Sequence, residues 1–339
     1  PVTYNRQHND RLGGDGRGGN GGGHMVSHRE GMGNAFRPET LVDALRMLAA
    51  QPLLPMAGGT DLMVRHRPAG GTVARFPLPV LMVGHLPELR GIRPCRDGLE
   101  IGAACTLTEY LDSPLVPEGW KPPVAGMASP AIRNIGTIGG NVVNASPAGD
   151  TLPMWQALDA EVVLASKDGT RTMPLADFIT GPGRTERGPG ELMTALRVPM
   201  TDPKRMYWYR KVGPRQANCL SKVSLFGWWT CGHGVLTACG VALGAVAPVV
   251  VRSREAEALL AGTPLPWLGP NGSHGSHGSK GQNGPCGPNG LEEGGNVREA
   301  FLQAMDGHIR PIDDQRSTAV YRREVAWRLM AEWLDGIGP

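Results

Sequence analysis

The chain has 339 residues, including 49 glycines and 30 prolines, and its 34 basic and 31 acidic residues leave a formal net charge of only +3. This balance, with no long block of Lys or Arg, argues against binding nucleic acid through counterion release. The six cysteines never form a CxxC pair, which argues against a zinc ribbon or an iron–sulfur cluster on this chain and favours a reduced, cytoplasmic setting.

The excess of glycine is confined to two places. Residues 1–34 hold ten glycines and no apolar stretch typical of a secretory signal, so a Gly-rich disordered head is predicted. Residues 269–290 carry glycine at every third position, but eight triplets are too few for a collagen helix. We therefore expect a flexible insertion at about 265–295, without a catalytic role.

The first half of the chain alternates short helices and strands. Thr40 is a plausible N-cap for an amphipathic helix that ends near Ala50, and an apolar strand follows at 53–56. Strands are also predicted at 80–83 and 99–102, with a helix over 106–112. Farther along, Lys167-Asp-Gly169 separates two strand-like runs, which is the signature of a hairpin.

The composition of the sequence changes after Pro199–Asp202. Residues 223–251 carry no formal charge, yet glycines and the turn-like Thr230–Gly234 in their middle favour two buried strands over a membrane helix. Helices are predicted at 253–261, 297–305 and 318–334. The chain is therefore expected to be α+β, with a first domain at 35–202 and a smaller one at 203–337.

Two glycine-containing loops carry the candidate chemistry. Ala57-Gly-Gly-Thr-Asp61 follows a strand, and backbone N–H groups in such a loop can converge on an anion, although two glycines before a threonine also make an ordinary turn. Residues 133–150 combine a predicted Gly-Gly turn at 139–140 with Asn141, Asn144, Ser146 and Asp150. These groups can bond a pyrophosphate and ribose hydroxyls, or the loop's own backbone. Neither loop has the GxGxxG pattern of a Rossmann site.

With AGGTD at 57–61 and RNIGTIGGNVVNASPAGD at 133–150, the shorter motifs GPGRT at 181–185, KVGPR at 211–215, SKV at 221–223, GAVAP at 244–248 and IDD at 312–314 complete a pattern. The chain resembles the FAD-binding subunit of the molybdenum hydroxylases, a family that includes xanthine dehydrogenase and carbon monoxide dehydrogenase. The likeness covers roughly 36–265 and 291–337. It implies a two-lobed FAD-binding domain of the vanillyl-alcohol-oxidase/PCMH type, followed by a smaller domain with an antiparallel sheet and helices.

The resemblance also implies which residues hold FAD without a covalent bond. The residues implied are Leu54, Pro55, Met56, Ala57, Gly58, Gly59, Thr60, Asp61, Gly136, Thr137, Ile138, Gly139, Gly140, Asn141, Asp150, Leu192 and Lys222. In this scheme the two loops wrap the pyrophosphate, Leu192 lies against the flavin, and Lys222 reaches the polar edge of the flavin. We expect Gly139→Val to eject the cofactor by placing a side chain where the diphosphate approaches. Asp313, Arg316, Tyr321 and Arg322 are expected to serve packing.

By the same resemblance, this chain accepts electrons from a [2Fe–2S] subunit in a complex whose large subunit binds molybdopterin, and it passes them to NAD⁺ or another acceptor. A dimer of heterotrimers is implied. No catalytic acid or base and no metal site are expected on this chain, because the flavin supplies the chemistry. Two alternatives stay open: a stand-alone flavoprotein oxidase or reductase of the same fold, and a scaffold that has lost FAD.

Overall fold

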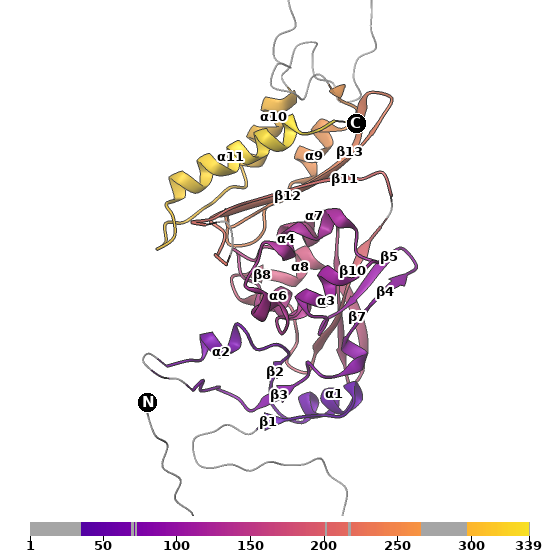
Figure 1. The fold of residues 1–339 in the computed structure, drawn as a ribbon, viewed down its shortest axis with the longest axis vertical. Coiled ribbons are helices and arrows are strands. Elements are labelled where there is room, and N and C mark those ends of the chain that lie inside the picture. The colour runs from indigo at the N-terminus through magenta and orange to yellow at the C-terminus, as the bar shows by residue number, and fades with distance from the viewer. Residues whose placement is uncertain are drawn as a thin grey trace, which may run out of the picture.

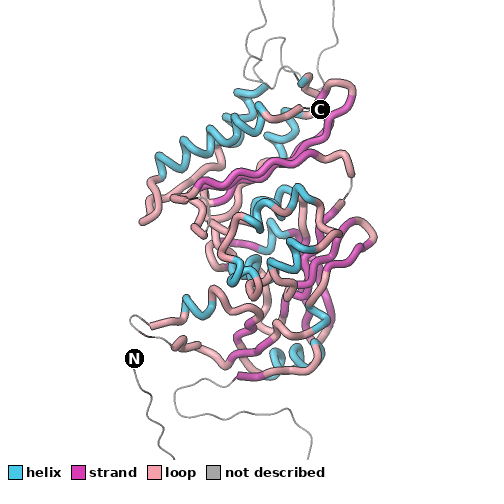
Figure 2. The backbone as a smooth tube through the Cα atoms, in the orientation of Figure 1, coloured by secondary structure: helices cyan, strands magenta, loops and turns pink. Residues whose placement is uncertain are grey.

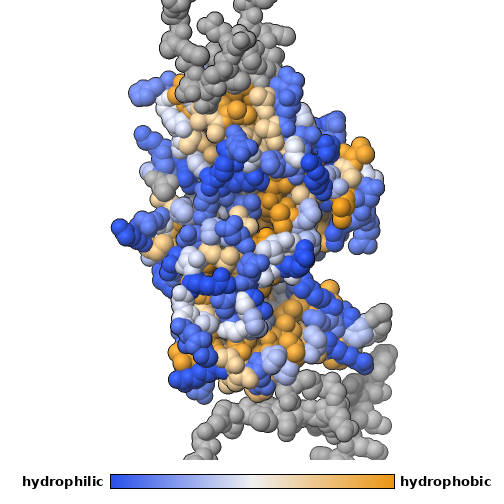
Figure 3. All heavy atoms as spheres, turned by 180° about the vertical axis from the view of Figure 1, so that it is seen from behind, coloured by the Kyte–Doolittle hydropathy of each residue, from blue (hydrophilic) through white to orange (hydrophobic). Residues whose placement is uncertain are grey.

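The computed structural model describes residues 35–68, 71, 73–200, 202–215, 218–265 and 297–338. The Gly-rich head and the glycine-triplet insertion, for which disorder and flexibility are predicted, lie outside these residues. In Figure 1 the described chain forms an elongated molecule, with a parallel sheet and a five-stranded sheet in its lower part and a three-stranded antiparallel sheet above them. The space-filling view from behind in Figure 3 has the same elongated outline. The α+β class predicted from the sequence is confirmed.

The smallest lobe is built on a parallel sheet at the bottom of Figure 1, in the order β1-β3-β2. The strands are β1 (Ala35–Phe36), β2 (Leu54–Met56) and β3 (Val80–Met82). Helix α1 (Leu41–Ala50) packs beside them and begins at Thr40, whose side chain accepts a hydrogen bond from the N–H of Asp43. The predicted capping residue is confirmed. The connection from β2 to β3 contains the short helix α2 (Leu62–Arg65).

A five-stranded antiparallel sheet in the order β4-β5-β10-β6-β7 forms the second lobe. Its strands are β4 (Ile92–Cys95), β5 (Gly98–Gly102), β6 (Glu161–Ser166), β7 (Gly169–Pro174) and β10 (Leu192–Pro199). The predicted hairpin joins β6 to β7, with Gly169 at φ 148° after the turn. Leu192, the first residue of the central strand β10, is buried in the core cluster that includes residues of α1 and β3.

Short helices cover this sheet and enclose a core around Trp120 and Trp155. They are α3 (Leu107–Asp112), α4 (Pro122–Ala125), α5 (Pro130–Arg133), α6 (Ile138–Asn144), α7 (Leu152–Ala157) and α8 (Leu175–Phe178), with the 3₁₀ turns Pro87–Leu89 and Glu118–Trp120 and the short pair β8 (Ile179–Gly181) and β9 (Arg184–Thr185). Thr106 begins α3 with a capping box that includes Glu109.

The third sheet contains the long uncharged stretch. Strands β11 (Met206–Val212), β12 (Val223–Gly232) and β13 (Val235–Gly244) pair antiparallel, and the predicted turn lies at His233–Gly234, where both φ angles are positive. Figure 2 shows helices α9 (Arg254–Leu260), α10 (Val297–Asp306) and α11 (Ala319–Asp335) on the outer side of this sheet. Helix α7 packs on the other side, so both faces are buried and the lack of charge follows.

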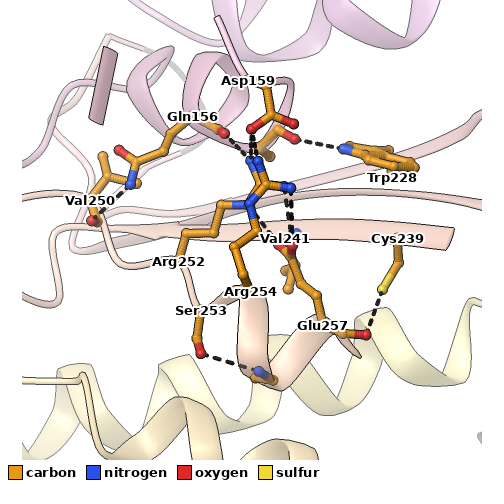
Figure 4. A network of polar contacts seen from close by, with 12 residues as sticks. Gln156, Asp159, Trp228, Cys239, Val241, Val250, Arg252, Ser253, Arg254 and Glu257 are labelled. Carbon is orange, nitrogen blue, oxygen red and sulfur yellow. Dashed lines mark hydrogen bonds and ion pairs between the residues drawn. The ribbon is translucent and has the colours of Figure 1, made fainter. Parts of the chain in front are cut away.

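A buried polar network joins α7 to the third sheet and α9, as Figure 4 shows. The Arg252 guanidinium, with its side chain 5% exposed, bonds the carboxylates of Asp159 and Glu257 and the carbonyl oxygen of Gln156. Trp228 donates to the carbonyl oxygen of Ala157 at 2.7 Å. These bonds hold the upper part of the molecule on the lower part. Within the described ranges, no helix combines the length and the apolar composition needed to cross a membrane.

Candidate functional site

The two glycine loops touch each other through their backbones. A Cβ atom on Gly58 would lie 1.9 Å from the carbonyl oxygen of Ile135 and 3.0 Å from the Cα of Gly136. Only glycine permits this approach, because any side chain would occupy the space of the neighbouring peptide. The structure therefore brings together two segments that are almost eighty residues apart in the sequence.

The first loop turns at Gly59, directly after β2. Its φ of +70° lies in the left-handed region, which glycine adopts without strain. The peptide N–H of Met63 then bonds the carbonyl oxygen of Gly59 at 2.9 Å and starts α2. Asp61 precedes this helix without capping it, which leaves its carboxylate available to the second segment.

The second segment is a helix where the sequence predicted a turn. Gly139 and Gly140 lie in the first turn of α6, and Thr137 caps that helix by accepting a hydrogen bond from the N–H of Gly140. The predicted turn is wrong because the Thr137 cap and the following apolar residues favour a helix, and the helix interior tolerates glycine when close packing requires it.

Gly139 is that close-packed position. Its N–H bonds the carbonyl oxygen of Ala103 at 2.9 Å, and a Cβ there would lie 2.6 Å from the Cβ of Ala103. A side chain at position 139 would thus push α6 away from the end of β5. The predicted loss of the cofactor in Gly139→Val therefore needs a different physical cause. The valine side chain would collide with Ala103, whereas the prediction had it block the approach of the diphosphate.

Between the two segments lies a cavity of about 580 Å³, within the range of ligand and cofactor sites. Fourteen of the predicted residues line it: Leu54, Pro55, Ala57, Gly58, Gly59, Thr60, Asp61, Gly136, Thr137, Gly139, Gly140, Asn141, Asp150 and Leu192. Met56, Ile138 and Lys222 do not. Met56 packs under the first loop, and Ile138 lies in the core of the second lobe with 1% of its surface exposed.

Polar side chains connect the two segments across the cavity edge. The amide nitrogen of Asn144 donates to the carboxylate of Asp61 at 3.2 Å, and its amide oxygen accepts from the Arg65 guanidinium at 2.5 Å. Arg65 also lines the cavity. This triad places a guanidinium at the cavity that the first loop also lines, which is an arrangement suited to an anion.

A buried ion pair holds Asp150, one of the residues that line the cavity. The Lys211 ammonium lies 2.5 Å from one carboxylate oxygen of Asp150, and the Ser221 hydroxyl donates to the other oxygen at 2.6 Å. The two charged side chains are only 8% and 7% exposed. Burial raises the pKa of Asp150 above its ordinary value, and the Lys211 ammonium and the Ser221 hydroxyl oppose part of that rise.

The resemblance singled out Lys222, whereas in the structure Lys211 pairs with Asp150 of the cavity lining. Neither lysine lines the cavity itself, and the Lys222 ammonium lies 5.0 Å from the ring centre of Tyr321. The strand register explains the difference, because β11 directs Lys211 toward Asp150. Its position at the start of the KVGPR motif was the signal available in the sequence.

Sequence reasoning also missed Arg187. Its side chain lines the cavity near Leu192 and donates to the carbonyl oxygen of Glu191 at 2.8 Å. Burial lowers the pKa of Arg187 from its ordinary value, and the Glu191 carboxylate opposes that change. Arg187 lies in a segment rich in glycine, proline and charged residues, and no pattern there marks it as a residue that lines a cavity.

The lining as a whole suits an elongated anionic ligand with apolar ends. It combines the backbone of the first loop and the guanidiniums of Arg65 and Arg187 with apolar side chains, namely Val83, Leu89, Met127, Leu192 and Leu220. FAD, with a diphosphate between two flat ring systems, has this chemistry. In the described part of the chain, no group of three or more His, Cys, Asp or Glu residues is placed to hold a metal ion.

Comparison with known proteins gives consistent results. Residues 30–201 match the family described as the FAD binding domain in molybdopterin dehydrogenase. The chain is 30% identical to the xanthine dehydrogenase FAD-binding subunit of Escherichia coli O157:H7, over 68% of this chain and 79% of that one. It is 32% identical to the nicotinate dehydrogenase FAD-subunit of Eubacterium barkeri, over 68% and 80%.

Solved structures show the same fold. CO dehydrogenase from Oligotropha carboxidovorans superposes with a TM-score of 0.74 at 24% identity, covering 90% of this chain and 97% of that chain. Quinoline 2-oxidoreductase from Pseudomonas putida 86 gives a TM-score of 0.72 at 20% identity, covering 88% and 94%. The predicted fold class is confirmed.

Proposed function

This chain belongs to the family of FAD-binding domains of molybdopterin dehydrogenases, and from that premise we propose that it receives electrons from a [2Fe–2S] subunit and passes them to NAD⁺ in a xanthine dehydrogenase-like complex. As a member it is an FAD-dependent oxidoreductase subunit of a molybdenum hydroxylase. The observation that carries the proposal is the contact of Gly58 with Ile135 and Gly136, which directs both loops at one cavity.

The residues that would hold the cofactor follow from the lining. The backbone N–H groups of residues 58–60, with the nearby Arg65, would bind the pyrophosphate, and residues 136–140 would line the cavity beside it. Asn141 and Asp150 would support ribityl, ribose or phosphate oxygens. Thr151 donates to the Asn141 amide oxygen at 2.6 Å and so orients that side chain. Leu192 would lie against a ring system of the cofactor.

The bound flavin supplies the redox chemistry, accepting electrons and donating a hydride or single electrons. The chain's own residues bind it, exclude water and set the local field. Arg65 and Arg187 belong to the cavity lining, and Lys211 lies behind it as the partner of Asp150; a positive charge near a reduced, anionic flavin stabilises that form. None of the residues that line the cavity in the described ranges is a histidine, so no proton relay is assigned.

The division of the chain into domains and the assembly are part of the proposal. Residues 35–202 would form the FAD-binding domain, and 203–337 the smaller C-terminal domain. The medium chains of CO dehydrogenases are relatives of this chain. We propose that it likewise assembles with a molybdopterin-binding subunit and a [2Fe–2S] subunit, as a dimer of heterotrimers.

The test is to purify the chain through a tag, identify co-purifying chains by mass spectrometry, and measure its flavin content. The proposal predicts one FAD per chain, one larger and one smaller partner chain, and bleaching of the flavin by NADH in the absence of oxygen. A coloured chain that oxidises a substrate alone would instead establish a stand-alone flavoprotein. A folded, colourless chain that takes up no added FAD would refute the electron-carrier function.

A further inference from the structure

One wall of the cavity is held in place from the C-terminal part of the chain. Ser146, Ala148, Gly149 and Asp150 form this wall. The N–H of Ala245 donates to the carbonyl oxygen of Pro147 at 2.8 Å, in the middle of that stretch. The Ser221 hydroxyl bonds the Asp150 carboxylate at the end of the stretch. Two separate segments, one at the end of β13 and one before β12, therefore contact the same wall.

A single buried guanidinium connects these two segments. Nη1 of Arg322, on α11, donates to the carbonyl oxygen of Ala245 at 2.9 Å and to that of Lys222 at 3.1 Å. Lys222 is the neighbour of Ser221 in the chain. Ala245 has a φ of +65°, which an alanine adopts only when surrounding contacts hold it there.

Asp314 fixes the guanidinium from the opposite side. Both of its carboxylate oxygens accept from Nη2 of Arg322, at 2.8 and 2.9 Å. Burial favours the neutral form of Asp314, but the N–H groups of Arg316 and Ser317 and the Arg322 guanidinium hold its pKa below the ordinary value. The pair is therefore ionised at neutral pH, and the direction of the guanidinium is set by a bidentate ion pair.

We infer that Arg322 is a positioning residue for the cofactor cavity, acting through the carbonyl groups of Ala245 and of Lys222, the residue next to Ser221, on the wall formed by residues 146–150. It touches neither the cavity nor its ligand. A guanidinium is suited to this role because its planar set of donors can bond two carbonyl oxygens and a carboxylate at once. The inference rests on the proposed function, since it takes FAD as the ligand of the cavity.

The chain offers a matched control in Arg252. Its side chain is as buried as that of Arg322, at 5% exposed, and it also combines carboxylate and carbonyl partners. Its partners Gln156, Asp159 and Glu257, shown in Figure 4, do not line the cavity. Arg322→Met and Arg252→Met should therefore destabilise the fold in the same way, since each leaves buried acceptors unpaired.

The experiment measures FAD affinity and the visible circular dichroism of the bound flavin for both variants, at a temperature where thermal melting shows each to be folded. We expect Arg322→Met to weaken FAD binding roughly 2- to 30-fold, the range of coupling between distant residues, and to change the dichroism. Arg252→Met should leave both unchanged. Unaltered FAD binding in Arg322→Met, or an equal loss in both variants, would overturn the inference.

Arg322→Lys keeps the proposal testable if the methionine variant does not fold. A lysine can still neutralise Asp314, but its single ammonium cannot keep the fixed geometry to both carbonyl oxygens. We expect a melting temperature closer to that of the unaltered chain together with reduced FAD affinity, and wild-type affinity would contradict the inference. Failure of the unaltered chain to bind FAD would instead refute the proposed function, so the two failures are distinguishable.

Discussion

Replacing Gly58 with alanine tests whether the backbone contact between the two loops creates the cofactor cavity. The new methyl carbon would lie 1.9 Å from the carbonyl oxygen of Ile135, whereas ordinary contact begins at 3.4 Å, so the loops would have to separate by about 1.5 Å. The obstructing atoms belong to the backbone, and no side-chain rotation can relieve the overlap.

The magnitude follows from the cost of overpacking, which is about 1–3 kcal/mol for an added methyl group in a tightly packed site. If the loops separate to relieve the overlap, the conformation that binds the cofactor is destabilised by this amount relative to the separated one. FAD affinity should then fall roughly 5- to 150-fold, because about 1.4 kcal/mol corresponds to a factor of ten. The loss would appear in a fluorescence titration of the flavin-free chain with FAD.

Gly190→Ala is the control for this variant. A Cβ at position 190 would have no heavy atom within 4 Å, and Gly190 does not line the cavity. FAD affinity should be unchanged there. Full FAD occupancy in Gly58→Ala, with a melting temperature equal to that of the unaltered chain, would show that the two loops do not form the cofactor site through this contact.

Three further predictions concern the charges and the bond to the cofactor. Lys211→Met should lower FAD affinity by about tenfold or more, because it leaves Asp150 buried without its partner, whereas Lys222→Met should change it less than about twofold; a titration of both variants that gives equal values would contradict the placement of the lysines. Glu191→Gln should reduce the free energy of unfolding by about 1 kcal/mol at pH 7. The Arg171 guanidinium lowers the pKa of Glu191, so this stability is present above the unfolded pKa of about 4.3 and is lost as the pH falls through the folded pKa. Urea unfolding at pH 7 and pH 3 would check the sign. Denaturation in guanidinium chloride should release all the flavin to a desalting filter, since the binding is non-covalent; flavin that stays with the chain would point to the thiol of Cys219, which lines the cavity.

Local chemistry made several elements predictable. Thr40 and Thr106 begin their helices with side chains that accept from the backbone N–H three residues on, so the boundary is encoded within one turn. Lys167-Asp-Gly169 encodes a hairpin in the same way. The paired glycines of both loops were sufficient to locate the candidate site, because close backbone approach limits which residue can be used.

The errors arose where distant parts of the chain decide the outcome. Gly139 and Gly140 look like a turn in sequence, yet packing against Ala103 makes them part of a helix. Lys211 and Lys222 are similar in sequence context, and only the pairing of β11 with β12 shows which of them reaches Asp150. The half-buried Arg187 carries no sequence signal that sets it apart from arginines exposed to solvent.

The sequence by itself located many of the helices and strands, the two glycine segments and the likeness to a family, because these depend on residues a few positions apart. The tertiary structure alone decided that Gly58 meets Ile135, that Lys211 pairs with Asp150 and that Arg322 bonds Ala245 and Lys222. Such contacts join residues 61 positions apart for Lys211 with Asp150, 77 for Arg322 with Ala245 and 100 for Arg322 with Lys222. They form only when the core brings the segments together, since no local preference of the backbone extends over such separations.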